Sequence, residues 1–340
     1  NAGVSLEDAR DYAAIGCVEI TIPGRANPHA VSNRINLLKC LELALNDGRS
    51  MITGEKFGPH TGDAGKFTCL EEVFQAYEQQ VIYFVDRMVE ENLRLQDVYT
   101  RTCPMPYKSL LTTGCLESGR DFNDRGARYD YHESMPMGIA NVADSLAAIE
   151  VLVFRERRYT MRELVEALRA NFPGEVARLE FLHRAPKYGN DNDLVDGLAA
   201  RVFRHYCDLM KVVSERSGVL FFAQPFTFLW LVEAGERTAA TPDGRRMGEN
   251  LAYSISPMQG RDYRGLTALI NSLARLPQKM APGSTSAIVE VEPGLFSEES
   301  LGHLVTLVQT AVEKGVGQLQ FNVVNEETLR RAQAGPEKYR

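Results

Sequence analysis

Strand-like and helix-like segments alternate in the last third of the sequence, and this alternation is the strongest constraint on the fold. The pattern predicts a strand at 286–291, a helix at 297–313 and a strand at 318–324, followed by a final helix that Asn325 caps. Strands separated by helices pack as parallel sheets with helices on their faces. We therefore expect an α/β fold with a barrel or a large sheet at its centre.

Helix signals dominate the rest of the chain. Asn36 precedes an apolar helical stretch that stops at Gly48, and both Thr68 and Thr160 are followed three residues later by glutamate, which is the capping-box pattern. An apolar run near Phe221 predicts a buried strand. The expected helices lie at 5–14, 36–48, from 68 to 93 or beyond, at 141–149, from 160 onward, and at 194–215.

Composition and charge exclude several partner classes. The 340 residues carry a formal net charge of −7, and Lys and Arg are scattered, so no basic stripe for nucleic acid or an anionic membrane is present in the sequence. The most apolar window, 218–235, is interrupted by Gln224, Pro225 and Thr227 and is too short to span a bilayer. No CxxC pair occurs, and the histidines show no metal-ligand spacing. We expect a cytoplasmic protein with no bound metal.

Cys17 is the cysteine with a candidate catalytic partner. It follows Gly16, whose backbone can adopt unusual conformations, and it precedes an extended run in which side chains two apart share a face. This spacing would place the Cys17 thiol beside the Glu19 carboxylate. A thiol next to a base suits nucleophilic or hydrogen-transfer chemistry. A buried cysteine with Glu19 pointing to solvent fits the same spacing, and spacing alone does not decide between them.

The residues around Cys17 resemble the cysteine-loop signature of the glycyl radical enzymes, the pyruvate formate-lyase-like superfamily. Eight blocks match in order and cover nearly the whole chain, which makes the resemblance far more specific than four residues alone. These blocks lie at 16–19, 36–48, 58–63, 138–149, 185–192, 240–246, 256–260 and 320–329.

The resemblance implies a fold and a set of roles. The fold is the C-terminal part of a ten-stranded α/β barrel, built from two half-barrels and surrounded by helices, with the cysteine loop inside. Cys17 matches the cysteine that becomes a thiyl radical and abstracts hydrogen from the substrate. Glu19 matches the carboxylate that takes or gives a proton. The strand at 286–292 would line the substrate cavity through Ile288 and Glu290, although an outward-facing Glu290 fits the alternation equally well.

The family also implies partners. The radical is stored on a glycine of the protein and is installed by a radical S-adenosylmethionine activating enzyme, so no bound cofactor is expected. A small-molecule substrate and a homodimer complete the expected set of partners.

The sequence around Cys17 narrows the reaction. Pyruvate formate-lyase has two adjacent cysteines, but Gly16 stands at the first of these positions, so formate C-acetyltransfer is disfavoured. The Cys-x-Glu pattern is similar to radical dehydratases, C–N and C–S lyases, and arylacetate decarboxylases. Val31 stands where diol and glycerol dehydratases carry an aspartate, which argues against simple diol dehydration. We expect a glycyl radical lyase; a decarboxylase and a catalytically incomplete or structural paralogue are the alternatives.

The predicted organisation is a single domain over residues 1–340. It comprises a cysteine loop at 14–25, a helical part at 36–215 and a second half-barrel at 218–340. The chain starts at Asn1, and none of its 27 glycines lies in the Arg-Val-x-Gly-Tyr context of the radical glycine. We therefore expect a fragment that lacks the N-terminal half and the radical loop, and that is inactive alone.

Overall fold

The computed structural model describes residues 3–339, so Asn1, Ala2 and Arg340 of the predicted domain lie outside it. The chain begins with α1 (Leu6–Arg10) and a hairpin of two antiparallel strands, β1 (Ala13–Ile15) and β2 (Glu19–Thr21). The expected helix over 5–14 is therefore correct only in its first half. Residues 13–15 pair with 19–21 because Gly16, at φ +56°, turns the chain back on itself.

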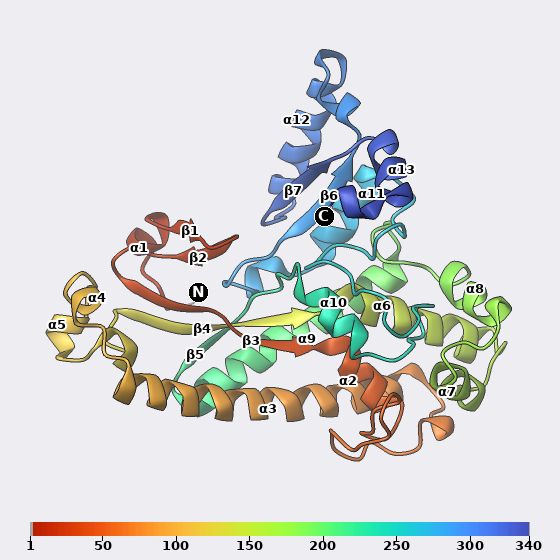
Figure 1. Cartoon of the computed structure of the whole chain (residues 1–340), viewed down its shortest axis with the longest axis horizontal. Helices are drawn as coiled ribbons and strands as arrows, with labels where there is room; N and C mark the ends of the chain where they lie inside the picture. Colours follow the sequence, from red (N-terminus) through yellow and green to blue (C-terminus); the bar gives the residue numbers. More distant parts are fainter. Residues whose placement is uncertain (1–2, 340) are drawn as a thin grey trace.

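A three-stranded parallel sheet forms the centre of the molecule (Figure 1). Its order is β3 (Ala26–Asn36), β4 (Tyr129–Met137) and β5 (Leu220–Ala223). Of these three strands, the sequence predicts only β5. The other two strands contain Pro28 and Pro136 among many polar residues, and this composition conceals a strand. The register of β3 against β4 shifts between His29 and Asn33, where Val31 adopts φ +50°.

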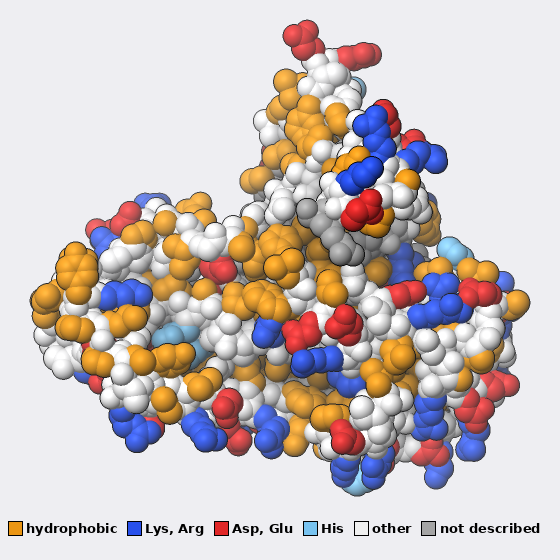
Figure 2. Space-filling view, viewed as in Figure 1, with side chains coloured by type: hydrophobic (Ala, Val, Ile, Leu, Met, Phe, Trp, Pro, Cys, Tyr) orange, Lys and Arg blue, Asp and Glu red, His pale blue; other side chains and the backbone are white. Residues whose placement is uncertain are grey.

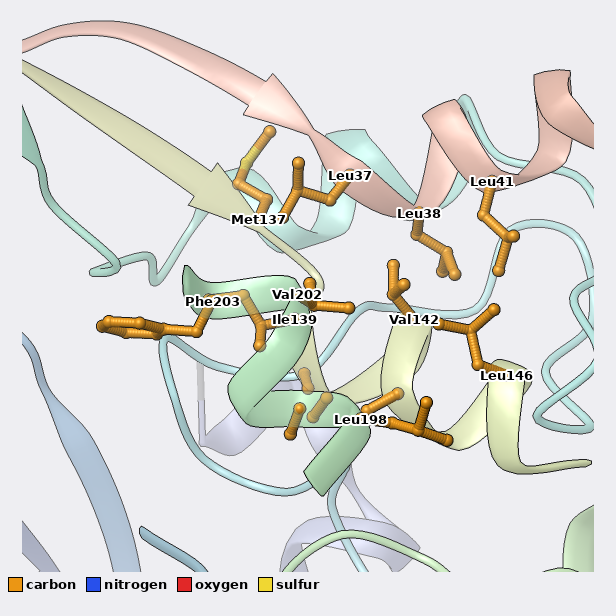
Figure 3. Packing of buried hydrophobic residues seen from close by; sticks show 14 of the residues in the cluster. Leu37, Leu38, Leu41, Met137, Ile139, Val142, Leu146, Leu198, Val202 and Phe203 are labelled. Carbon is orange, nitrogen blue, oxygen red and sulfur yellow. The ribbon is translucent and has the colours of Figure 1, made fainter. Parts of the chain in front are cut away.

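Helices cover the sheet, and two of them run along its length: α3 (Leu70–Thr102) and α9 (Asp193–Ser217). Apolar side chains of α2, α6, α9 and the end of β4 form a continuous core, seen in Figure 3. The other helices in this part of the molecule are α2 (Leu37–Ala44), α4 (Pro106–Leu110), α5 (Cys115–Ser118), α6 (Ile139–Ala148), α7 (Met161–Arg169), α8 (Glu175–His183) and α10 (Trp230–Glu236). The helix α11 (Leu266–Arg275) lies beside β6 in Figure 1. No helix within residues 3–339 has the length and apolar character needed to cross a membrane.

The predicted helix caps are confirmed at two of three positions, Thr160 and Asn325. Thr160 forms the capping box of α7 with Glu163, and Asn325 accepts the backbone N–H of Thr328 in the last helix. Asn36 also caps its helix, α2. Thr68 does not cap α3: Cys69 is the N-cap residue and makes no side-chain bond there. The backbone N–H and the hydroxyl of Thr68 instead donate to Glu72, one turn further along.

The last third has the predicted alternation. β6 (Ala287–Val291) and β7 (Leu319–Val323) pair in parallel, and α12 (Glu298–Glu313) connects them before α13 (Glu326–Ala334). This unit stands above the central sheet in Figure 1. The α/β class is thus confirmed. Within residues 3–339 the strands form three separate sheets, and a closed barrel is not seen.

Candidate active site

The tip of the β1–β2 hairpin presents Cys17. This cysteine is exposed, whereas Glu19, the first residue of β2, is only 5% exposed. Glu19 Oε2 accepts the backbone N–H of Cys17 at 2.7 Å and that of Val18 at 3.0 Å. The carboxylate therefore closes the turn that carries the thiol. The spacing also allowed a buried cysteine with Glu19 in solvent, and the structure shows the reverse: Cys17 is exposed and Glu19 is buried.

Gly16 is required by the same turn. A Cβ at this position would lie 2.5 Å from Glu19 Oε2, and the φ of +56° is one that side chains disfavour. The clash and the backbone conformation act together, so a side chain at position 16 is incompatible with the observed placement of Glu19.

The thiol borders a cavity of about 400 Å³ between the hairpin and the loops before β6 and β7. Lys279, Ser284 and Gln318 from these loops lie on its wall with Cys17. Figure 2 shows the surface hollowed between the hairpin side and the upright β6–β7 unit. The cavity gives a small molecule access to the sulfur atom.

The central sheet lies behind the hairpin. The Tyr131 hydroxyl on β4 donates to the carbonyl of Ile20 at 2.8 Å, which ties the sheet to β2. Glu133, two residues further on the same face of β4, is fully buried. Burial, followed by the negative charge of Glu19, raises the pKa of Glu133 to about 9.

Comparisons with known proteins decide the family. The pyruvate formate lyase-like family matches residues 1–235, and the glycine radical family matches residues 251–340. The chain belongs to the pyruvate formate lyase-like family. This result confirms the resemblance seen in the sequence.

Named relatives of this pyruvate formate lyase-like chain are glycyl radical dehydratases and lyases. It is 32% identical to a (2S)-3-sulfopropanediol dehydratase from Klebsiella oxytoca, over 99% of the chain and 42% of that protein. It is 32% identical to an isethionate sulfite-lyase from Bilophila wadsworthia, over 99% of the chain and 41% of that protein. The structure of the glycerol-bound B12-independent glycerol dehydratase from Clostridium butyricum superposes on this chain with a TM-score of 0.93 at 33% identity. The match covers 99% of this chain and 43% of the dehydratase chain. The chain thus spans less than half the length of these relatives.

The residues predicted from the sequence are brought together only in part. Cys17 and Glu19 meet at the hairpin tip, but of these two only Cys17 lines the cavity. Ile288 and Glu290 do not line it either. Ile288 is buried and its backbone N–H donates to Ser256 Oγ at 2.7 Å, whereas Glu290 is exposed, as in the second of the two predicted orientations of this strand. The roles of Ile288 and Glu290 in substrate binding stay predictions.

Sequence reasoning missed Glu133 in this pyruvate formate lyase-like site. Its surroundings come from separate parts of the chain, since Gln224 Nε2 donates to Glu133 Oε2 at 3.0 Å across 91 positions. A glutamate in a strand that the sequence does not predict gives no local signal of burial. Only the assembled sheet buries Glu133 and brings it within the influence of the Glu19 charge.

Proposed function

We propose that the native polypeptide carrying this chain is a glycyl radical lyase. It eliminates a small leaving group, such as water, from a small polar substrate. The observation that carries this proposal is the exposed Cys17 thiol at a cavity, in a turn whose N–H groups bind the buried Glu19 carboxylate. The dehydratase and sulfite-lyase names of relatives at 32% identity support elimination.

The residues of the hairpin fit a protein radical as the initiating group. A radical stored on a glycine supplies the acceptor for the hydrogen atom of the Cys17 thiol. Cys17 Sγ then takes a hydrogen atom from a substrate carbon and returns one to the product carbon at the end, so the thiol is regenerated. Its exposure at the wall of the cavity lets it reach such a carbon.

Glu19 handles the proton in this scheme. Its carboxylate takes the proton of a substrate hydroxyl as the neighbouring carbon–oxygen bond breaks, and it passes that proton to the departing hydroxide, which leaves as water. The overall change, when the leaving group is water, is loss of one water from the substrate and formation of a carbonyl at the carbon that carried the deprotonated hydroxyl. The backbone N–H groups of Cys17 and Val18 hold the Glu19 carboxylate in place, so the acid–base group keeps a fixed position relative to the thiol.

Two competing reactions are less well supported. Formate C-acetyltransfer uses paired cysteines and conflicts with position 16, which holds glycine in place of a second cysteine. Decarboxylation uses the same Cys17 and Glu19 but releases carbon dioxide, and it is an outcome of the assay below.

The proposal also covers the activating partner, the oligomeric state and the cellular compartment of the enzyme. A radical S-adenosylmethionine activating enzyme installs the glycyl radical, and the active form is a homodimer in the cytoplasm. The six cysteines, which are all free, support a reducing compartment.

The test is an anaerobic assay of the activated native polypeptide. Glycerol, propane-1,2-diol, (2S)-3-sulfopropanediol, trans-4-hydroxy-L-proline and isethionate are each supplied, and products are identified by mass spectrometry. We expect elimination from at least one of them, slowed ~10²–10⁴-fold in Glu19→Gln. Carbon dioxide from indoleacetate without any elimination product would favour the decarboxylase. No turnover despite a glycyl radical signal would favour a structural paralogue.

A further inference from the structure

The cavity beside Cys17 is lined by two loops besides the hairpin, and one buried side chain ties these two loops together. The loops are 278–285, before β6, and 315–318, before β7. The side chain is that of Gln278, which lies just after α11 and is 6% exposed. Gln278 lines the same cavity as the thiol, and the scheme above gives it no role.

The side-chain amide of Gln278 makes three hydrogen bonds. Its Oε1 accepts the hydroxyl of Thr285 at 2.8 Å and the backbone N–H of Gly317 at 2.9 Å. Its Nε2 donates to the carbonyl of Leu273 at 2.8 Å. The N–H of Gly317 can only donate, so the amide atom that faces it is the oxygen. Both acceptor positions of Oε1 are then used, which leaves this oxygen none for a substrate.

These bonds join three segments that are separate in the chain. Leu273 lies in α11, Thr285 just before β6, and Gly317 just before β7. The last two segments approach closely because residue 317 has no side chain: a Cβ there would lie 2.7 Å from Thr285 Oγ1. Thr285 and Gly317 both line the cavity with Cys17, so these hydrogen bonds lie in the cavity wall itself.

The loop that Gln278 holds also carries a strained residue. Ser284 adopts φ +110°, which is unfavourable for a residue with a side chain, and it lines the cavity directly before Thr285. Such strain persists only where the surroundings hold it. Gly283, on the other side, is packed so closely that a Cβ would lie 2.9 Å from the carbonyl oxygen of Ala223 in β5. Ser284 is therefore held from both sides, and one of the two holds is the bond from Thr285 to Gln278.

We propose that Gln278 is a positioning residue for the reaction at Cys17: its hydrogen bonds fix the two loops against which a substrate is held beside the thiol. This inference rests on the proposed function. Gln278 takes part in no bond that forms or breaks. Its contribution is to the orientation of the substrate, since a misplacement of about 1 Å can cost ~10²-fold in rate.

Turnover in the activated native polypeptide tests this role. Gln278→Leu removes all three hydrogen bonds at similar size and should lower kcat by ~10²-fold. The matched control is Gln80→Leu: Gln80 is also buried and donates to the carbonyl of Pro59 at 2.9 Å, but it does not line the cavity. We expect wild-type kcat in this control. Wild-type kcat in Gln278→Leu would overturn the proposal, and an equal fall in both variants would do the same.

Variants of Thr285 give a second test, which also applies if Gln278→Leu does not fold. Thr285→Val removes one of the three bonds at nearly equal size, so it should lower kcat less than Gln278→Leu. Combining the two changes should add little further loss, because both remove the same bond. Thr285→Ser keeps a hydroxyl and should recover most of the rate that Thr285→Val loses. Equal rates in the serine and valine variants would overturn the proposal.

Two measurements that need no radical separate this proposal from the lyase function. In Gln278→Leu we expect the Gly317 amide hydrogen to exchange with solvent faster and iodoacetamide to alkylate Cys17 several-fold faster, both measured by mass spectrometry. Alkylation of the exposed Cys103 in the same sample should not change. An unchanged alkylation rate at Cys17 would overturn the proposal and leave the lyase function standing. Turnover in Cys17→Ser would refute the lyase function, and the two measurements would still decide whether Gln278 holds the cavity wall.

Discussion

Glu19 Oε2 lies where a side chain at Gly16 would have to be, because a Cβ on residue 16 would approach it to 2.5 Å. The carboxylate fills this space and binds the N–H groups of Cys17 and Val18. One side chain thus fixes the shape of the turn that presents the thiol. The Gly-Cys-x-Glu pattern is a structural unit as well as a chemical one.

Gly16→Ala tests this unit. The variant meets both a left-handed backbone, which costs about 1–2 kcal/mol, and the clash with Glu19. We expect the Cys17 and Val18 amide hydrogens to exchange with solvent faster, as measured by NMR or mass spectrometry.

The matched control is Gly54→Ala. Gly54 has φ +73°, and nothing lies within 4 Å of the position that an added methyl group would occupy, so this variant meets the backbone cost alone. Unchanged exchange at Cys17 and Val18 in Gly16→Ala would show that Glu19 does not close the turn. Equal acceleration in both variants would lead to the same conclusion.

The pH dependence of stability reports on Glu133. Its pKa is about 9 in the folded chain against its usual value near 4.3, so between these values the folded state holds the extra proton. The stabilisation from this proton is complete at low pH and is lost as pH rises through that window. Relative to Glu133→Gln, wild type should lose up to about 1.4 kcal/mol per pH unit. Urea unfolding between pH 5 and 9 measures this difference, and a constant difference would contradict a neutral Glu133.

A buried ion cluster joins the two parts that the family comparisons recognise separately. Arg261, 9% exposed, binds Asp243 at 2.8 Å and lies 3.6 Å from Asp144, and both carboxyl groups are fully buried. Arg261→Ala removes the cation that binds these groups and leaves only the charges of Lys187 and Arg245 near them, so it should reduce the free energy of unfolding by up to about 3–5 kcal/mol.

The control for this cluster is Arg275→Ala, which breaks an exposed pair with Asp193 at 2.5 Å and should cost less than about 1 kcal/mol. Both variants are compared by urea unfolding at one pH. Equal losses would show that the cluster adds nothing beyond a surface ion pair.

The sequence predicts most helices and the β6–β7 unit because their signals are local. Caps such as Asn36 and Thr160 act within one turn of their helix. The long sheet strands give no such signal: β3 and β4 are polar, contain proline, and are paired across the chain. In β3 the bulge around Val31 also breaks the two-residue alternation on which strand prediction depends.

In the candidate site, too, the sequence predicts what is local and misses what depends on the assembled fold. Cys17 and Glu19 are two residues apart and could be predicted as a pair, although the antiparallel hairpin and the capping role of Glu19 could not. Glu133 owes its burial and its raised pKa to β2, β4 and the segment after β5 meeting in space. No local sequence pattern predicts contacts between segments that lie so far apart in the chain.

The most direct test of the central claim is Cys17→Ser in the activated native polypeptide. Sulfur is replaced by oxygen with little change in size, but an O–H bond is too strong to give up its hydrogen atom to a glycyl radical. Turnover is measured beside the electron-spin signal, with the exposed Cys103→Ser as the matched control. We predict an intact glycyl signal and no turnover in Cys17→Ser, and wild-type turnover in Cys103→Ser. Turnover above a few per cent in Cys17→Ser would contradict the account.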